Sequence, residues 1–208
     1  MRETPAAATS FVGVAFRRGL QSSIGDEVVM QSTGGPYVHS EFILGRAGDI
    51  RCYTACGSNR WHREPVEGFI PVRRMQSLQP APGWDVVTFP LNDGRHGYNA
   101  VYAFILQLVA AQIPYNHADL WQCCVKAMLP FERDVRCEQP DSWRERGVFC
   151  SQACLLLLRH LSRQGCITLP VHVRDAMERV NSRGCSPNSL FRLVHPGLPP
   201  VPARAPGR

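Results

Sequence analysis

The chain contains 208 residues, 44% of them hydrophobic and 19% charged, and it carries a formal net charge of +6 at pH 7. This composition is that of an ordinary soluble globular protein, and the length suits one domain with a sizeable core. No apolar run approaches the roughly 18 residues of a membrane span, and residues 1–10 lack the basic start and apolar run of a secretion signal.

The predicted elements change character halfway along the chain. The first half has short segments rich in β-branched and aromatic residues and bounded by Gly, Pro or Asn, which predict strands at 11–16, 37–44, 49–55, 68–72 and 84–90. The second half has helical periodicity, which predicts helices at 97–113, 116–129, 150–164, 171–182 and 187–194. Strands followed by helices predict an α+β fold with helices packed on an antiparallel sheet.

Two local signals support these elements. The connection GRAG predicts a hairpin between the strands at 37–44 and 49–55. Ser186 and Pro187 have the residue types preferred at the N-cap and first position of a helix.

One domain is predicted over residues 10–194. Residues 1–9 are expected to form a flexible tail, and residues 195–208, which are rich in Pro and Arg, are expected to be disordered. Inside the domain, the polar segment 130–147 joins two predicted helices and leads to Cys150. A loop of this length in a compact domain predicts a lid or a substrate-binding rim.

Cys150 is distinguished from the other eight cysteines by its place in GVFCSQACLLLLRHL, where it opens a predicted helix. A helix N-terminus stabilises a thiolate and can lower the thiol pKa from about 8.5 to about 3.5–7.5. The same backbone N–H groups can bind the oxyanion formed when a thiolate attacks a carbonyl. Cys154, one turn later, is expected to face the leucine-rich core, as most free cysteines do.

His39 is the predicted base for this thiol. It lies in a strand whose apolar residues Val38, Phe42 and Leu44 point to one face, so His39 and Glu41 share the other face. A histidine with a carboxylate two residues away suits a general base and the group that orients it. A partly exposed strand histidine beside an exposed glutamate is the alternative interpretation.

Six segments, in order, resemble the circularly permuted branch of the NlpC-type papain-like fold. This branch includes YiiX-like bacterial proteins, lecithin retinol acyltransferase relatives, and phage and large DNA-virus proteins, and its histidine strand precedes its cysteine helix. VHSEFIL resembles the family's His-x-Glu strand, and VFCSQACLLLL resembles its nucleophile helix. The other similar segments are CYTACGSNRWHREPV, WDVVTFP, AQIPYNHADLW and CSPNSLFRLV.

The resemblance implies a papain-like thiol hydrolase that cleaves a peptide or isopeptide bond through an acyl-enzyme. It implies Cys150 as nucleophile and His39 as base. Relatives take the third polar residue either from an acid two positions after the histidine, here Glu41, or from the following strand, here Thr54. Glu41 is the preferred prediction.

The resemblance also implies that Ser151, Gln152 and Thr54 contact substrate, although relatives often have Glu at position 152. The expected partners are a protein, a peptide or an acyl lipid. A lipid acyltransferase or thioesterase with the same Cys-His pair, and a non-catalytic viral or virion protein that keeps the fold, are the alternatives.

Nine cysteines without regular spacing predict free thiols in a reducing compartment, which is the cytoplasm or another intracellular location, including a virion or a host cytoplasm. The spacing of Cys52 and Cys56 is not the C-x2-C of a zinc site, and the chain has no glycine-rich phosphate loop. The sequence therefore predicts no metal and no cofactor. The arginines are scattered and give no strong nucleic-acid signal.

Overall fold

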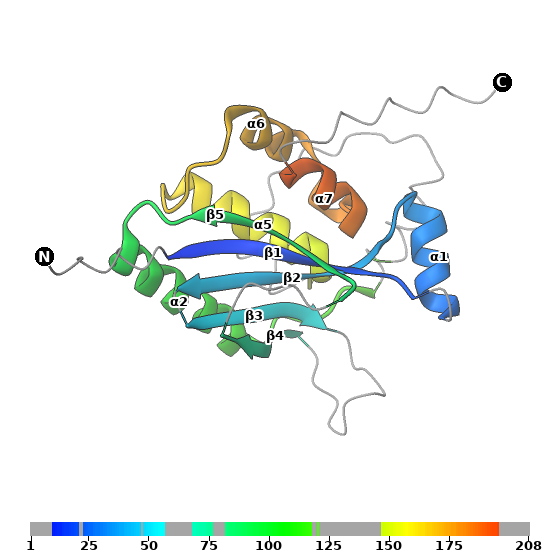
Figure 1. Cartoon of the computed structure of the whole chain (residues 1–208), viewed down its shortest axis with the longest axis horizontal. Helices are drawn as coiled ribbons and strands as arrows, with labels where there is room; N and C mark the ends of the chain where they lie inside the picture. Colours follow the sequence, from blue (N-terminus) through cyan, green and yellow to red (C-terminus); the bar gives the residue numbers. More distant parts are fainter. Residues whose placement is uncertain are drawn as a thin grey trace, which may run out of the picture.

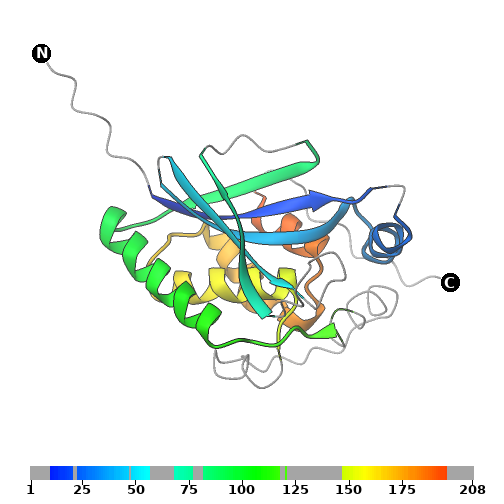
Figure 2. The same cartoon turned by 90° about the horizontal axis from the view of Figure 1, so that it is seen from below.

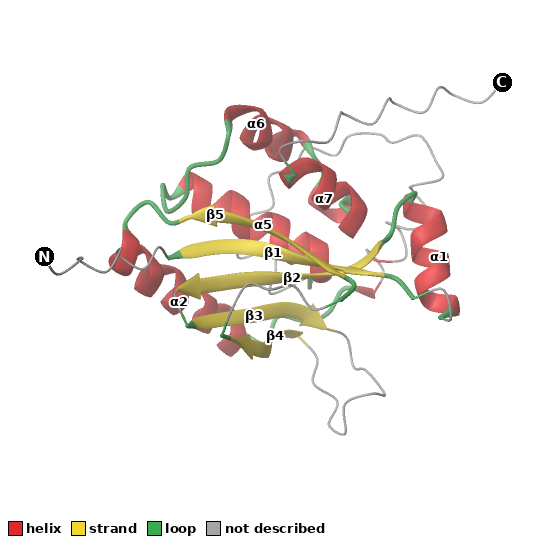
Figure 3. Cartoon of the chain, in the orientation of Figure 1, coloured by secondary structure: helices red, strands yellow, loops and turns green. Residues whose placement is uncertain are grey.

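The structure is a computed structural model of the chain and describes residues 10–20, 23–46, 48–56, 68–76, 82–117, 120 and 147–195. It is an α+β fold, as the sequence predicts (Figure 3). Figure 1 labels its strands, which are β1 (Phe11–Arg18), β2 (Tyr37–Arg46), β3 (Asp49–Cys56), β4 (Gly68–Met75) and β5 (Trp84–Pro90). The described helices are α1 (Ile24–Thr33), α2 (Gly94–Ala110), α5 (Cys150–Arg163), α6 (Val171–Arg179), the 3₁₀ turn η1 (Ser182–Gly184) and α7 (Pro187–Val194).

The five described strands join one antiparallel sheet in the order β4-β3-β2-β1-β5. The five predicted strands are confirmed, as is the hairpin between β2 and β3. The register is interrupted between Arg17 and Arg18, where β1 pairs with His39 and then with Tyr37, so Val38 is an extra residue in β2. This bulge lies immediately before the predicted base.

The described helices α2, α5, α6 and α7 lie on one face of the sheet, and α1 lies at one end of it (Figure 2). Phe42 and Leu44 of β2 are fully buried there against the leucines of α5, in the main hydrophobic core. On the other face, Ile43 packs in a smaller cluster with Ala15 and Cys52. None of the described helices is long and apolar enough to cross a membrane.

Four of the predicted helices are present within a few residues of the expected bounds. Ser186 is the N-cap of α7, where its side chain accepts a hydrogen bond from the Ser189 N–H, and Pro187 is the first helical residue, as predicted. Most of the predicted helix 116–129 and of the predicted lid 130–147 lies outside the described residues. The predicted tail 1–9 and all but the first residue of the predicted tail 195–208 lie outside them as well.

Helix α1 was missed by the sequence analysis, although its cap signals are present. The Ser23 side chain accepts a hydrogen bond from the Asp26 N–H, and Gly34 ends the helix in the left-handed conformation at φ 66°. The helix itself contains Gly25 and two adjacent valines, which have low helix propensity. The caps, rather than the helix interior, carry the sequence signal.

Asn188 connects α7 to the beginning of β2, although 151 residues separate Asn188 from Tyr37. Its buried side chain accepts a hydrogen bond from the Tyr37 N–H at 2.9 Å and donates to the Tyr37 carbonyl at 2.8 Å. It also donates to the Thr33 hydroxyl at 2.5 Å. One amide therefore satisfies two backbone groups at the start of β2, just before His39, and joins them to the last residue of α1.

Candidate functional site

Cys150 is positioned by a short stretch of extended chain that runs beside residues 114–116. The Val148 N–H donates to the Pro114 carbonyl at 3.0 Å, and the Asn116 N–H donates to the Val148 carbonyl at 3.2 Å. Gly147 begins this stretch at φ 73°, and a Cβ there would lie 2.4 Å from the Pro114 carbonyl oxygen. Only glycine fits this approach, which places Cys150 at the first residue of α5.

We expect Gly147→Ala to lower the free energy of unfolding by about 2–3 kcal/mol, because the left-handed conformation and the clash with backbone add together. Gly165→Ala is a matched control, since Gly165 has a similar φ of 69° but open space around its Cβ position. That variant should lose only about 1 kcal/mol. Urea denaturation measures both values, and equal losses would contradict a steric role for Gly147.

The Cys150 thiol is buried beside Ser40 of β2. Only 3% of the surface of Cys150 is exposed. Burial raises the pKa of the Cys150 thiol, although the backbone and hydroxyl of Ser40 and the neighbouring Ser151 favour the ionised form. The predicted lowering of this pKa is therefore wrong, because loss of solvent outweighs the donors at the helix start. Cys154 is fully buried in the main core, as predicted.

Ser151 and Gln152, predicted to contact substrate, make contacts within the protein. The Ser151 hydroxyl donates to the Cys185 carbonyl at 2.7 Å, and the Gln152 side-chain oxygen accepts from the Phe149 N–H at 3.4 Å. Both residues are buried. Their contacts fix the first turn of α5 and therefore the position of Cys150.

His39, Glu41 and Thr54 lie together, as a group that we call the histidine cluster. The imidazole Nε2 is 3.4 Å from the Thr54 hydroxyl and 3.9 Å from a carboxylate oxygen of Glu41. The Thr54 hydroxyl donates to the Ser40 carbonyl at 3.0 Å. Both predicted orienting groups therefore approach the same ring nitrogen, and Thr54 lies closer.

Arg73 and Trp84 complete the surroundings of the histidine cluster, and sequence reasoning missed both. The Arg73 guanidinium is 2.8 Å from Glu41, and it also stacks on the Trp84 ring at 3.9 Å from the centroid. The Trp84 ring meets the His39 ring edge-on at 6.4 Å. Arg73 and Trp84 come from the two edge strands, so their approach depends on a register that local sequence does not reveal.

Burial and two nearby arginines oppose protonation of His39. Burial lowers the pKa of His39 to about 4, and the nearby guanidiniums of Arg17 and Arg73 lower it further, against a smaller effect of Asp26. Burial raises the pKa of Glu41, although Arg73 counteracts it. At neutral pH the imidazole is therefore uncharged and able to accept a proton.

This histidine makes the stability of the fold depend on pH. Between about pH 6.5 and pH 4 the unfolded chain binds a proton at His39 that the folded chain does not, so stability falls as the pH falls. Because a quarter of the side chain remains exposed, we expect a loss of about 1–3 kcal/mol across this window. Urea denaturation at several pH values should show a smaller loss for His39→Gln and an unchanged loss for His172→Gln, which alters an exposed histidine.

Strand alternation separates the imidazole from the thiol. Ser40 points toward α5 and Cys150, together with Phe42 and Leu44, whereas His39 and Glu41 point to the other face of β2. No hydrogen bond joins His39 to Cys150. The structure brings Cys150 against the residue next to His39 on the chain, and it brings His39, Glu41 and Thr54 together on the opposite face.

The described residues contain no group of three or more His, Cys, Asp or Glu side chains that could bind a metal ion.

Comparisons with protein-family models, with curated proteins and with solved structures gave no significant match to this chain.

Proposed function

We propose that the chain is a thiol hydrolase with a permuted papain-like fold, which cleaves an amide bond through an acyl-enzyme. The observation that carries the proposal is the position of Cys150, whose thiol opens α5 and lies beside Ser40, the residue that follows His39 on β2. The order of the elements, with the histidine strand before the cysteine helix, is that of the permuted branch. The neutral imidazole of His39 supports its assignment as base.

In the proposed reaction, His39 takes the thiol proton while the Cys150 sulfur attacks the carbonyl carbon of the substrate. The backbone N–H groups at the start of α5 stabilise the oxyanion. The protonated imidazole then gives its proton to the leaving amine, and water hydrolyses the thioester with His39 again acting as base. Because both groups are neutral at rest, the proton moves during the attack rather than before it.

The proposal requires a local change of β2, because the imidazole and the thiol lie on opposite faces. The bulge at Val38 supplies a route for this change. Moving the irregularity past His39 would shift that residue by one position relative to β1 and turn its side chain toward α5. We therefore propose that substrate binding moves the bulge and completes the Cys-His pair.

The test is a panel of three fluorogenic substrates with the full-length chain: a ubiquitin C-terminal amide, a peptidoglycan-type peptide amide and an acyl-lipid ester. Turnover of any one should fall by about 10³-fold or more in Cys150→Ser and remain close to wild type in Cys154→Ser, the buried thiol one turn away. Cleavage of the ester alone would favour a thioesterase or acyltransferase. Turnover that survives Cys150→Ser would contradict the proposal, and so would the absence of turnover with all three substrates.

A second candidate is a non-catalytic protein that keeps the fold as a binding or virion scaffold. The buried, un-ionised Cys150 thiol and the imidazole on the opposite face favour it. Iodoacetamide labelling separates the candidates. A hydrolase whose strand rearranges should label at Cys150 before Cys154 and Cys185, and His39→Ala should slow this step. Equal and slow labelling of Cys150, Cys154 and Cys185 supports the scaffold.

A further inference from the structure

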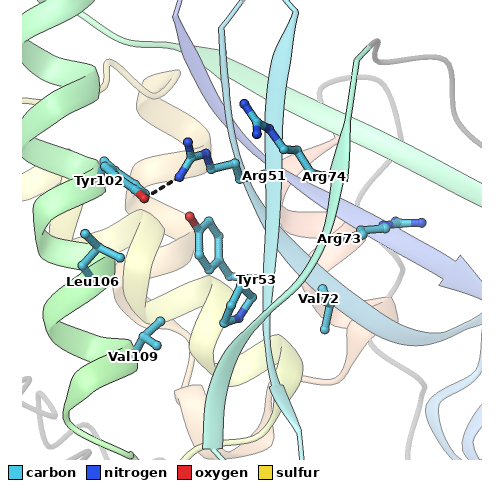
Figure 4. Close-up of a pocket in the computed structure, with 9 residues that line it drawn as sticks. Arg51, Tyr53, Val72, Arg73, Arg74, Tyr102, Leu106 and Val109 are labelled. Atoms are coloured by element: carbon cyan, nitrogen blue, oxygen red, sulfur yellow. Dashed lines mark hydrogen bonds between the residues drawn. The ribbon is translucent and has the colours of Figure 1, made fainter. Parts of the chain in front are cut away.

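A cavity of about 430 Å³ lies between the edge of the sheet and helix α2, within the size range of small-molecule sites. Figure 4 shows its walls. Arg51 and Tyr53 of β3 line one wall with Arg74 of β4, and Tyr102 and Leu106 of α2 line the other. Neither Cys150 nor His39 lines it.

One end of the cavity carries an excess of positive charge. Asp49 is shared by three guanidiniums, those of Arg74 at 2.7 Å, Arg51 at 3.3 Å and Arg46 at 3.8 Å. Arg46 lies outside the cavity, so the two lining guanidiniums of Arg74 and Arg51 against one carboxylate leave a charge of +1 at this end. Burial opposes ionisation of Asp49, but the hydrogen bonds from Arg51 and Arg74 outweigh it and lower its pKa, so its own charge is already present.

The donors at this end are only partly used. Arg51 donates to Asp49 and to the Tyr102 hydroxyl, which fixes its guanidinium against α2. Arg74 uses its Nε for Asp49, and none of the described acceptors contacts its two terminal nitrogens. Its side chain is 68% exposed, so these nitrogens are accessible to an incoming anion.

The other end of the cavity is apolar. Tyr102, Leu106 and Val109 lie at helical spacings of four and three residues and form one stripe along α2 (Figure 4). Val72 of the edge strand also lines the cavity. Leu106 is 46% exposed and Val72 is 37% exposed. Arg73 also belongs to the cavity wall, but its guanidinium points away from the cavity toward Glu41.

We propose that this cavity binds an anionic amphiphile, whose carboxylate or phosphate group contacts Arg74 and Arg51 while its alkyl chain lies along Leu106 and Val72. The cationic and apolar ends of one cavity match the two ends of such a molecule. The proposal does not depend on the catalytic assignment of Cys150, because it uses none of the same residues.

The test is isothermal titration calorimetry of the full-length chain with twelve-carbon probes kept below their micelle concentrations. Dodecanoate and dodecyl phosphate should each bind about tenfold or more tightly than uncharged dodecanol, and the tighter of the two anions identifies the head group. Octanoate should bind at least about tenfold more weakly than dodecanoate, because each buried methylene contributes about 0.8 kcal/mol.

Two variants and a matched control locate the site. Arg74→Gln should weaken dodecanoate binding about fivefold or more, because a charge-assisted contact is lost, and Leu106→Asp should weaken it about tenfold. Both positions are exposed, so neither change should unfold the chain. Arg46→Gln removes a guanidinium that pairs with the same Asp49 but does not line the cavity, and it should change binding less than about twofold. Equal binding of dodecanol and dodecanoate, no heat at about 1 mM dodecanoate, or an equal loss in Arg46→Gln would overturn the proposal.

Discussion

Replacing Asn188 by alanine is expected to lower the free energy of unfolding by about 3 kcal/mol or more. The change removes the hydrogen-bond partner of the Tyr37 N–H and of the Tyr37 carbonyl, in a buried setting where water cannot replace it. It also removes one of the two hydrogen bonds of the Thr33 hydroxyl, which still donates to the Val29 carbonyl. Each buried polar group left without a partner costs about 1–3 kcal/mol, and the small void adds to this. Urea denaturation monitored by circular dichroism gives the value.

Asn181→Ala is the matched control for this prediction. Asn181 is only partly buried, and its side chain accepts one local hydrogen bond, from the Arg183 N–H at 3.0 Å. We expect the control to lose about 1 kcal/mol or less. A loss in Asn188→Ala no greater than that of the control would show that the contacts of Asn188 contribute little to the stability of the fold.

Under the proposed mechanism, replacing His39 by alanine is expected to reduce kcat/KM by about 10⁴-fold on any amide substrate that the panel identifies. Without His39, the buried Cys150 thiol, whose pKa is raised, has no base to take its proton when the proposed rearrangement of β2 occurs. Far-UV circular dichroism should show that the variant keeps its fold. A variant that retains activity within about tenfold of wild type would remove His39 from the mechanism.

Variants of Thr54 and Glu41 identify the orienting group. Thr54 lies closer to the His39 ring nitrogen, and the Glu41 carboxylate is already engaged by Arg73. We therefore expect Thr54→Val to reduce kcat/KM by about tenfold or more, and Glu41→Gln to reduce it by less. The reverse order would support the sequence-based preference for Glu41.

The strands were predictable because their signals are local. Val12, Val14 and Phe16 alternate with other residues in β1, and all three are buried in the main core. Alternation also gave the correct faces of β2, with Phe42 and Leu44 on the side of the core and His39 and Glu41 on the other. Alternation alone did not predict on which of the two faces of β2 helix α5 would pack.

The surroundings of the candidate residues were not predictable, because they depend on contacts distant in sequence. Arg73 reaches Glu41 only because a register shift between Cys52 and Tyr53 sets the pairing of β3 with β4. The raised pKa of Cys150 follows from complete packing around the thiol, whereas the sequence signal reports only its place at a helix start. The local sequence pattern therefore predicts which residues belong to the site, whereas burial in the fold determines whether their side chains are charged.

The link between Asn188 and Tyr37 has a consequence for the newly made chain. Protein synthesis adds about 5–20 residues per second, so the 151 residues between the two partners take about 8–30 s to be made. During that interval the start of β2 lacks the amide that later satisfies its backbone groups. The segment before His39 therefore reaches its final form late, after Asn188 of α7 has been made.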